Sequence, residues 1–167
     1  ACAEIDSEYG ATLSVIDLSK IDDVIISFND YAKSLYEASD DNSVLSAVVR
    51  SIKKADNYGG NNKSEGYTNM VDLAGIVQAG AEYAEGADMV LSAIDKAVIY
   101  RRNGSDHSDV CGLAAYYPLE LQGSAELKIF ADVAVSPYYL SFVDRTVYGS
   151  TNSGNTENYD NSSVLDL

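Results

Sequence analysis

Hydrophobic residues recur with helical spacing over two stretches in the first third of the chain. In each stretch the apolar residues fall on one stripe, and the charged residues lie away from it. The first stripe consists of Ile21, Val24, Ile25, Phe28, Ala32 and Leu35. The second consists of Val44, Leu45, Val48, Val49 and Ile52. We therefore expect two amphipathic helices, separated by the polar residues 38–43, each packed through one face.

A short segment rich in β-branched residues precedes these helices. Residues 12–16 lie between Gly10 and Asp17, and this pattern predicts a strand. Ser19, with Asp22 three residues later, forms a capping-box pattern that predicts the start of the first helix. The chain is thus expected to run from a strand through a turn into a helix.

Glycine and proline divide the rest of the chain. The sequence "NYGGNNKSEGY" at 57–67 predicts a long flexible loop. Two further helices are expected in 67–84 and from Gly86 onward, and the second runs into a short strand at 97–100. The segment "CGLAAYYPLE" at 111–120 predicts another strand, ended by Pro118. The pattern at 124–132 does not distinguish helix from strand, and a final helix is expected from Pro137, in its first turn, to a residue before Gly149.

The order of these elements predicts an α/β fold. Strands separated by helices are typical of layered α/β architectures, but only about three strands are expected, at 12–16, 97–100 and 112–117. A sheet of three strands is narrow, so we expect it to be incomplete without strands from elsewhere. Residues 1–149 are expected to belong to one domain that begins inside a helix, and the polar residues 150–167 to form a flexible tail or linker.

The strongly negative net charge disfavours anionic partners. The net charge is −15, from 26 acidic and 11 basic residues, so the average surface repels nucleic acid and anionic lipid. The basic residues Arg50, Lys53 and Lys54 are expected on a solvated helix face. No apolar run approaches the roughly 20 residues of a membrane span, and no signal-peptide pattern opens the chain. The many Tyr, Asn, Ser and Asp residues, without tryptophan, suit a secreted or surface protein.

A thiol nucleophile would need the only histidine, His107, beside Cys111 or Cys2. Residues four apart meet on a helix, but 104–109 consist largely of turn-forming residues, so the spacing of His107 and Cys111 is not expected to bring them together. Asp106 and Asp109 would raise the pKa of a nearby thiol, which opposes nucleophilic activity. We expect a loop histidine beside a small buried cysteine. Nothing in the pattern places Cys2 near His107, and the two cysteines could pair or remain free.

Other chemistries lack their residue patterns. One histidine and two cysteines do not supply a usual zinc site, no GxSxG elbow is present, and the glycines of 57–67 lack the spacing of a phosphate-binding loop. The paired acids at 22–23 and 40–41 are expected at helix starts. Tyr116, Tyr117, Tyr138 and Tyr139 could line a ligand face, although core packing is the more frequent role of such residues. We therefore predict no catalytic, cofactor-binding or metal-binding residue in this chain.

Four segments in series resemble the C-terminal half of clostripain-like cysteine peptidases. They are "ATLSVIDLSKID" at 11–22, "YTNMVDLAGIVQ" at 67–78, "AVIYRRNG" at 97–104 and "CGLAAYYPLE" at 111–120. The last is similar to the "GLSIYFP" strand of that family, from which Ala114 and Ala115 depart. The resemblance covers roughly residues 10–148.

The resemblance implies a three-layer α/β/α sandwich like that of caspases and gingipains. It also implies a hydrolase that cleaves peptide bonds after Arg or Lys with a Cys–His dyad; many such enzymes are secreted, processed bacterial proteins, and some use calcium. In this family the dyad lies before the "TLSVIDLSK"-like segment. His107 comes after that segment and is followed by Ser108 instead of glycine, and only eight residues separate Cys2 from Ala11. No catalytic residue is therefore carried over.

We accordingly expect a non-catalytic C-terminal portion of an extracellular or cell-surface peptidase. Its partners would be an upstream catalytic segment of the same protein and a peptide substrate, with neither nucleic acid nor a membrane span. No cofactor is predicted on this chain, and calcium would belong to the parent enzyme. The alternative is a surface-protein binding or structural module built on the same scaffold.

Overall fold

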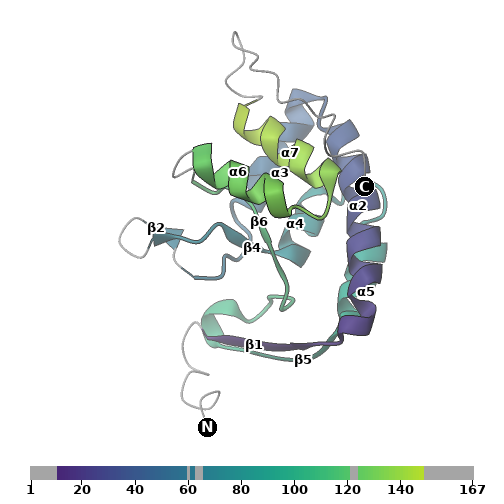
Figure 1. The fold of residues 1–167 in the computed structure, drawn as a ribbon, viewed down its shortest axis with the longest axis vertical. Coiled ribbons are helices and arrows are strands. Elements are labelled where there is room, and N and C mark those ends of the chain that lie inside the picture. Colours follow the sequence, from purple (N-terminus) through teal and green to yellow (C-terminus); the bar gives the residue numbers. More distant parts are fainter. Residues whose placement is uncertain (1–10, 60, 63–65, 121–123, 149–167) are drawn as a thin grey trace.

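The computed structural model describes residues 11–59, 61–62, 66–120 and 124–148 (Figure 1). In chain order its elements are β1 (Thr12–Ile16), η1 (Leu18–Lys20), α2 (Ile21–Ala38), α3 (Asn42–Ile52), β2 (Asn61–Asn62), β3 (Gly66–Tyr67), β4 (Met70–Asp72), α4 (Leu73–Gly80), α5 (Ala87–Ala97), β5 (Val98–Asn103), η2 (Ser105–His107), β6 (Ala114–Tyr116), α6 (Ser124–Val133) and α7 (Pro137–Tyr148). The fold is α/β, as the sequence predicts, and helices supply most of its core.

The strands of the described residues form three separate two-stranded antiparallel sheets: β1 with β5, β2 with β3, and β4 with β6. The expected strands at 12–16 and 97–100 pair with each other. The third expected strand pairs instead with β4, which the sequence pattern assigned to a helix. The three expected strands therefore do not lie in one sheet, because their partners are set by contacts between distant segments.

The helices pack around a common core. Helix α2 contacts both α5 and α7, and α3 packs against α4. Aromatic rings fill the space between α2 and α7: the ring centroids of Phe28 and Tyr139 are 5.0 Å apart, and those of Tyr139 and Phe142 are 6.3 Å apart. Phe142, Tyr31 and Leu35 are fully buried. We call α2, α3, α4, α5 and α7 the helical body; the β1–β5 ribbon lies at its lower end in Figure 1.

The start of the first long helix differs from the prediction. Asp17, rather than Ser19, is the capping residue: its Oδ1 accepts hydrogen bonds from the backbone N (3.0 Å) and hydroxyl (2.7 Å) of Ser19. Asp17 thereby caps the 3-10 turn η1, and α2 follows without a side-chain cap. The predicted capping box is wrong because the intervening turn places Ser19 inside a helical segment.

The expected helix over 67–84 begins later than predicted. Asp72 has an extended backbone (φ −54°, ψ 125°) and caps α4 through Gly75 N, so the helix starts at Leu73. The preceding residues form β4. Gly86 separates α4 from α5 as expected, with a left-handed backbone (φ +88°).

The elements from β5 onward agree in part with those predicted from the sequence. Strand β5 extends to Asn103, beyond the expected end at Tyr100, whereas β6 covers only Ala114–Tyr116, because the left-handed backbone of Gly112 (φ +92°) precedes it. The undetermined stretch 124–132 is helical, and α7 begins at Pro137 as predicted. Within the expected loop 57–67, residues 61–62 and 66–67 pair as β2 and β3. The expected N-terminal helix, the tail at 150–167 and the boundary between 149 and 150 lie outside the described residues.

Of the helices that the structure describes, none combines the length and the apolar character that crossing a membrane requires.

Candidate functional site

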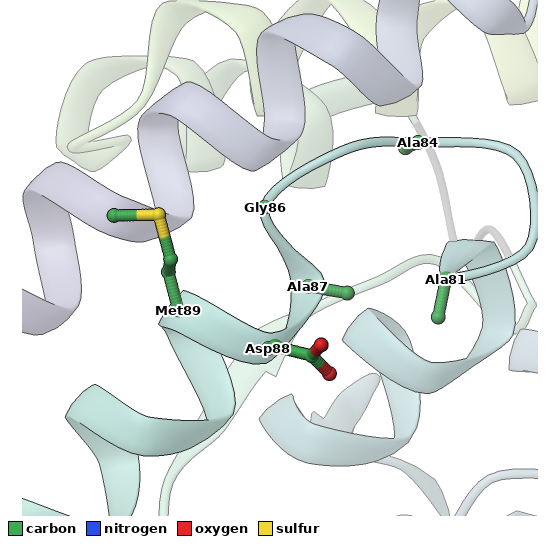
Figure 2. Close-up of a pocket in the computed structure, with 6 residues that line it drawn as sticks. All are labelled: Ala81, Ala84, Gly86, Ala87, Asp88 and Met89. Atoms are coloured by element: carbon green, nitrogen blue, oxygen red, sulfur yellow. The ribbon is translucent and has the colours of Figure 1, made fainter.

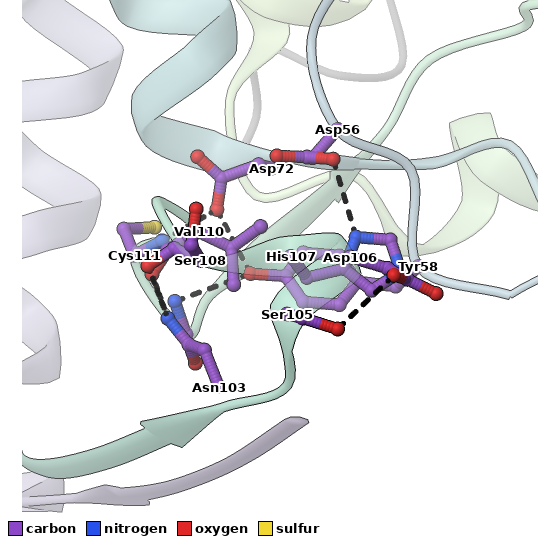
Figure 3. A network of polar contacts seen from close by, with 11 residues as sticks. Asp56, Tyr58, Asp72, Asn103, Ser105, Asp106, His107, Ser108, Val110 and Cys111 are labelled. Carbon is purple, nitrogen blue, oxygen red and sulfur yellow. Dashed lines mark hydrogen bonds and ion pairs between the residues drawn. The ribbon is translucent and has the colours of Figure 1, made fainter. Parts of the chain in front are cut away.

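His107 lies in η2, the short 3-10 turn that follows β5 (Figure 3). Its Nδ1 is 3.2 Å from Oδ1 of Asp56, and its side chain is 20% exposed. The imidazole ring also stacks on Tyr58, at 6.3 Å between centroids. The histidine is therefore oriented by Asp56 and Tyr58.

Cys111 belongs to a different set of contacts. Its backbone N donates to Oδ1 of Asp72 at 2.8 Å, and its thiol donates to the backbone oxygen of Leu113 at 3.3 Å. The residue is buried, and burial raises the pKa of the thiol to about 11. The thiol is thus protonated near neutral pH and directed at a backbone carbonyl.

The geometry separates the two residues that the sequence analysis weighed as a dyad. Residues 105–107 do form a helical turn, but it ends before Cys111, so the four-residue spacing does not bring the side chains together. The raised thiol pKa agrees in direction with the expectation, but its cause does not: burial and the nearby Asp72 raise it, not Asp106 and Asp109. Cys2, the other cysteine considered, lies outside the described residues.

Asp72 is the centre of the network in Figure 3, and sequence reasoning missed it. Its carboxylate is buried and accepts three hydrogen bonds: Tyr58 Oη (2.8 Å) and Cys111 N (2.8 Å) donate to Oδ1, and Gly75 N (3.0 Å) donates to Oδ2. The Tyr58 hydroxyl in turn accepts a bond from Gly112 N at 3.2 Å. Burial and the adjacent carboxylate raise the pKa of Tyr58 far above its usual range. An aspartate just before a helix was the available signal, but it indicates only the bond to Gly75.

The loop between β5 and Cys111 is pinned by Asn103. Its Nδ2 donates to the backbone oxygens of Ser108 (3.3 Å) and Val110 (3.1 Å). This contact closes the loop back onto the end of its own strand. The network therefore fixes loops to strands. One of its atoms, Asn103 Oδ1, is buried and has no hydrogen-bond partner among the described residues.

A separate hollow of about 340 Å³ lies at the turn before α5 (Figure 2). Small residues and Met89 line most of it, and Asp88 is the charged side chain in its lining. Polar groups do not converge there, as they do in sites that orient a ligand. Elsewhere in the described part of the chain, no three His, Cys, Asp or Glu side chains are grouped so that they could hold a metal ion.

The remaining candidates have structural roles. Tyr117 and Tyr139 are buried in the core, as the packing interpretation predicts, and Tyr138 lies under Lys33 Nζ at 5.8 Å. Asp41 caps α3 by accepting hydrogen bonds from the hydroxyl and the backbone N of Ser43, both at 2.7 Å, and these bonds lower the pKa of its carboxyl. Asp22 and Asp23 lie in the first turn of α2. The basic residues 50, 53 and 54 are exposed, as expected of a solvated face.

Comparison with known proteins leaves the family open: no protein-family model, no curated protein and no solved structure matches the chain.

Proposed function

We propose that this chain is the C-terminal, non-catalytic portion of a clostripain-like cysteine endopeptidase that cleaves after Arg or Lys. In this role it supports an active site held upstream, within a caspase-like sandwich. The peptidase assignment rests on the four segments in series that resemble the family. Extracellular or cell-surface location, bacterial origin and any calcium requirement follow from the same resemblance and belong to the same proposal.

The separation of His107 from Cys111 is the observation that carries the non-catalytic role. A thiol peptidase needs a thiolate close to an imidazole, but here the imidazole contacts Asp56 and the thiol contacts Leu113 O, with its pKa raised to about 11. This arrangement disfavours a nucleophile at Cys111 on two grounds: the partner of the thiol is a backbone carbonyl instead of the imidazole, and burial keeps the thiol protonated. The work of the chain would then be architectural.

Reporter peptides ending in Arg or Lys test this proposal. The isolated chain is expected to give no turnover, and the chain joined to the polypeptide encoded upstream is expected to hydrolyse them. Cys111→Ala should leave the activity of the joined protein unchanged, since that thiol takes no part. Activity of the isolated chain that Cys111→Ala abolished would overturn the proposal.

A binding or structural module on the same scaffold is the second candidate. It is favoured by the exposed apolar side chains of the β1–β5 ribbon, which are available for contact with another molecule. The sequence encoded before Ala1 separates the two candidates. A His-Gly and an Asp-Ala-Cys there would support the peptidase, and their absence would support the module.

A further inference from the structure

The β1–β5 ribbon has one covered face and one bare face. Cross-strand pairing sets Leu13 opposite Arg102 and Val15 opposite Tyr100, so these four side chains share a face. On that face Leu13 is 50% exposed, Val15 44% and Tyr100 50%. The opposite face is held to the rest of the protein, because Ser14 Oγ donates to Gly112 O at 2.8 Å. We call the bare side the outer face of the ribbon.

Strand β5 adds further apolar surface beside this face. The register shifts between Val15 and Ile16, which leaves Ile99 as an extra residue without a partner on β1. Ile99 is 64% exposed. Two consecutive large apolar residues, Ile99 and Tyr100, are thus in contact with solvent on one strand.

Arg101 and Arg102 follow directly, and both are exposed. Within the described residues neither forms an ion pair, in contrast to Arg145, which pairs with Asp40 at 2.8 Å. The chain as a whole carries a net charge of −15. Arg102 lies on the outer face and Arg101, which pairs with Ser14, on the opposite one. The free edge of β5 therefore carries a positive charge on each side, on an acidic protein, and is complementary to a strand with adjacent carboxylates.

The unpaired edge of β5 indicates that the partner is a polypeptide strand. In the described part of the chain β5 pairs with β1 alone, so its second edge presents backbone N–H and C=O groups without a strand partner. A neighbouring polypeptide strand satisfies such groups in alternation and also covers apolar side chains. Nucleic acid and anionic lipid supply neither strand pairing nor a favourable encounter with a chain of this charge.

We propose that the free edge of β5 and the outer face of the ribbon bind an extended acidic segment of another polypeptide as a third strand. In this arrangement adjacent carboxylates of the segment face Arg101 and Arg102, and an apolar residue packs on Tyr100. A second copy of this chain fits less well, because pairing two β5 edges would bring arginines of like charge together. The proposal does not rest on the peptidase assignment.

Two labelled strand peptides test the proposal by fluorescence anisotropy at low salt. The acidic probe carries a central Val-Asp-Glu-Val, and the matched peptide carries Val-Lys-Lys-Val in the same frame. We expect the acidic probe to bind at least about tenfold more tightly than the lysine peptide. The double variant Arg101→Ser/Arg102→Ser should weaken binding of the acidic probe roughly fivefold. The effect is limited because both arginine–carboxylate pairs with the probe are exposed to solvent.

The matched control is Lys53→Ser/Lys54→Ser, which removes an exposed basic pair elsewhere in the chain. This control should leave binding unchanged, and protection of β5 amides from hydrogen exchange should accompany binding of the acidic probe. Equal binding of both peptides, an equal loss in both double variants, or no binding would overturn the proposal. So would a stable dimer of the chain alone that protects the β5 amides, because the edge would then serve a second copy. Turnover of Arg- and Lys-ended peptides is a separate measurement, so failure of the peptidase assignment is recognised independently.

Discussion

Apolar side chains are buried in the helical body but exposed to solvent on the β1–β5 ribbon. Leu35 of α2 and Phe142 of α7 have no exposed surface, whereas Leu13 of β1 is 50% exposed although it lies in regular secondary structure. The body is closed by its own residues, since each amphipathic face meets another helix. The ribbon covers one face only. The difference indicates that the body determines stability, while the ribbon keeps surface available for contacts outside the described residues.

The largest expected effect compares the same substitution in the two regions. Leu35→Ala should lower the free energy of unfolding by about 2–5 kcal/mol, because it removes buried methyl groups and leaves a cavity. Leu13→Ala should change it by less than about 0.5 kcal/mol, because that side chain is half exposed. Urea denaturation followed by circular dichroism measures both. Equal losses would show that the outer face of the ribbon is buried in solution, and the comparison would fail.

The second effect concerns Asp72, which accepts a hydrogen bond from Cys111 N, next to the Gly112 that contacts Ser14 of the ribbon. We call this place the junction of the ribbon and the helical body. Asp72→Asn should lower the free energy of unfolding by about 1–3 kcal/mol. The carboxylate accepts three hydrogen bonds through its two oxygens, whereas an amide has only one oxygen that can accept. Asp56→Asn is the matched control: its side chain is 39% exposed and contacts His107, so a loss under about 1 kcal/mol is expected. Thermal unfolding of the two variants checks this. A larger loss for Asp56→Asn would mean that the histidine contact, not the Asp72 network, holds the junction.

The third effect tests how the ribbon is attached to the body. Gly112→Ala places a Cβ 2.8 Å from Ser14 Cβ in a backbone with φ +92°, whereas the nearest atom to a Cβ at Gly86, with φ +88°, is 3.8 Å away. Both variants carry the strain of a left-handed backbone, about 1–2 kcal/mol. Only Gly112→Ala must also displace β1.

Hydrogen exchange distinguishes these glycine variants. Amides of β1 should exchange faster in Gly112→Ala than in Gly86→Ala, while amides of α2 should respond alike in both. Uniform acceleration over the whole chain in Gly112→Ala would show instead that ribbon and body unfold as one unit.

The same division separates what could be predicted from sequence and what could not. The helices of the body follow from local spacing, because Val24, Phe28 and Leu35 lie on one stripe of a 3.6-residue period. Strand pairing has no such local signal: the pairing of Met70 with Tyr116 joins segments far apart in the chain. Residues 70–72 also continue the apolar pattern of α4, so only the N-cap at Asp72 marks where strand gives way to helix.

The junction shows why the site could be predicted only in part. The turn-forming residues before Cys111 indicated that His107 and Cys111 would not meet on a helix. The partners of Asp72 could not be predicted, because Tyr58 and Cys111 lie 14 and 39 positions away in the sequence. Local patterns identify the cap, but the buried network depends on the tertiary fold.

The last prediction concerns the Cys111 thiol, whose effect on stability depends on pH. Burial raises its pKa from 9.0 to about 11, so the neutral thiol is favoured in the folded protein. The associated stability is fully present below pH 9 and is lost as the pH rises through about 11. At pH 8 the folded protein holds about a hundredfold less thiolate than the unfolded chain, because each pKa unit is a factor of ten.

Alkylation by iodoacetamide in a Cys2→Ser background, followed by mass spectrometry, tests this difference. The reaction should be at least about a hundredfold slower in buffer than in urea, since burial also blocks the reagent. Equal rates would mean that Cys111 is open to solvent as a thiolate, and a nucleophilic role would then have to be considered again.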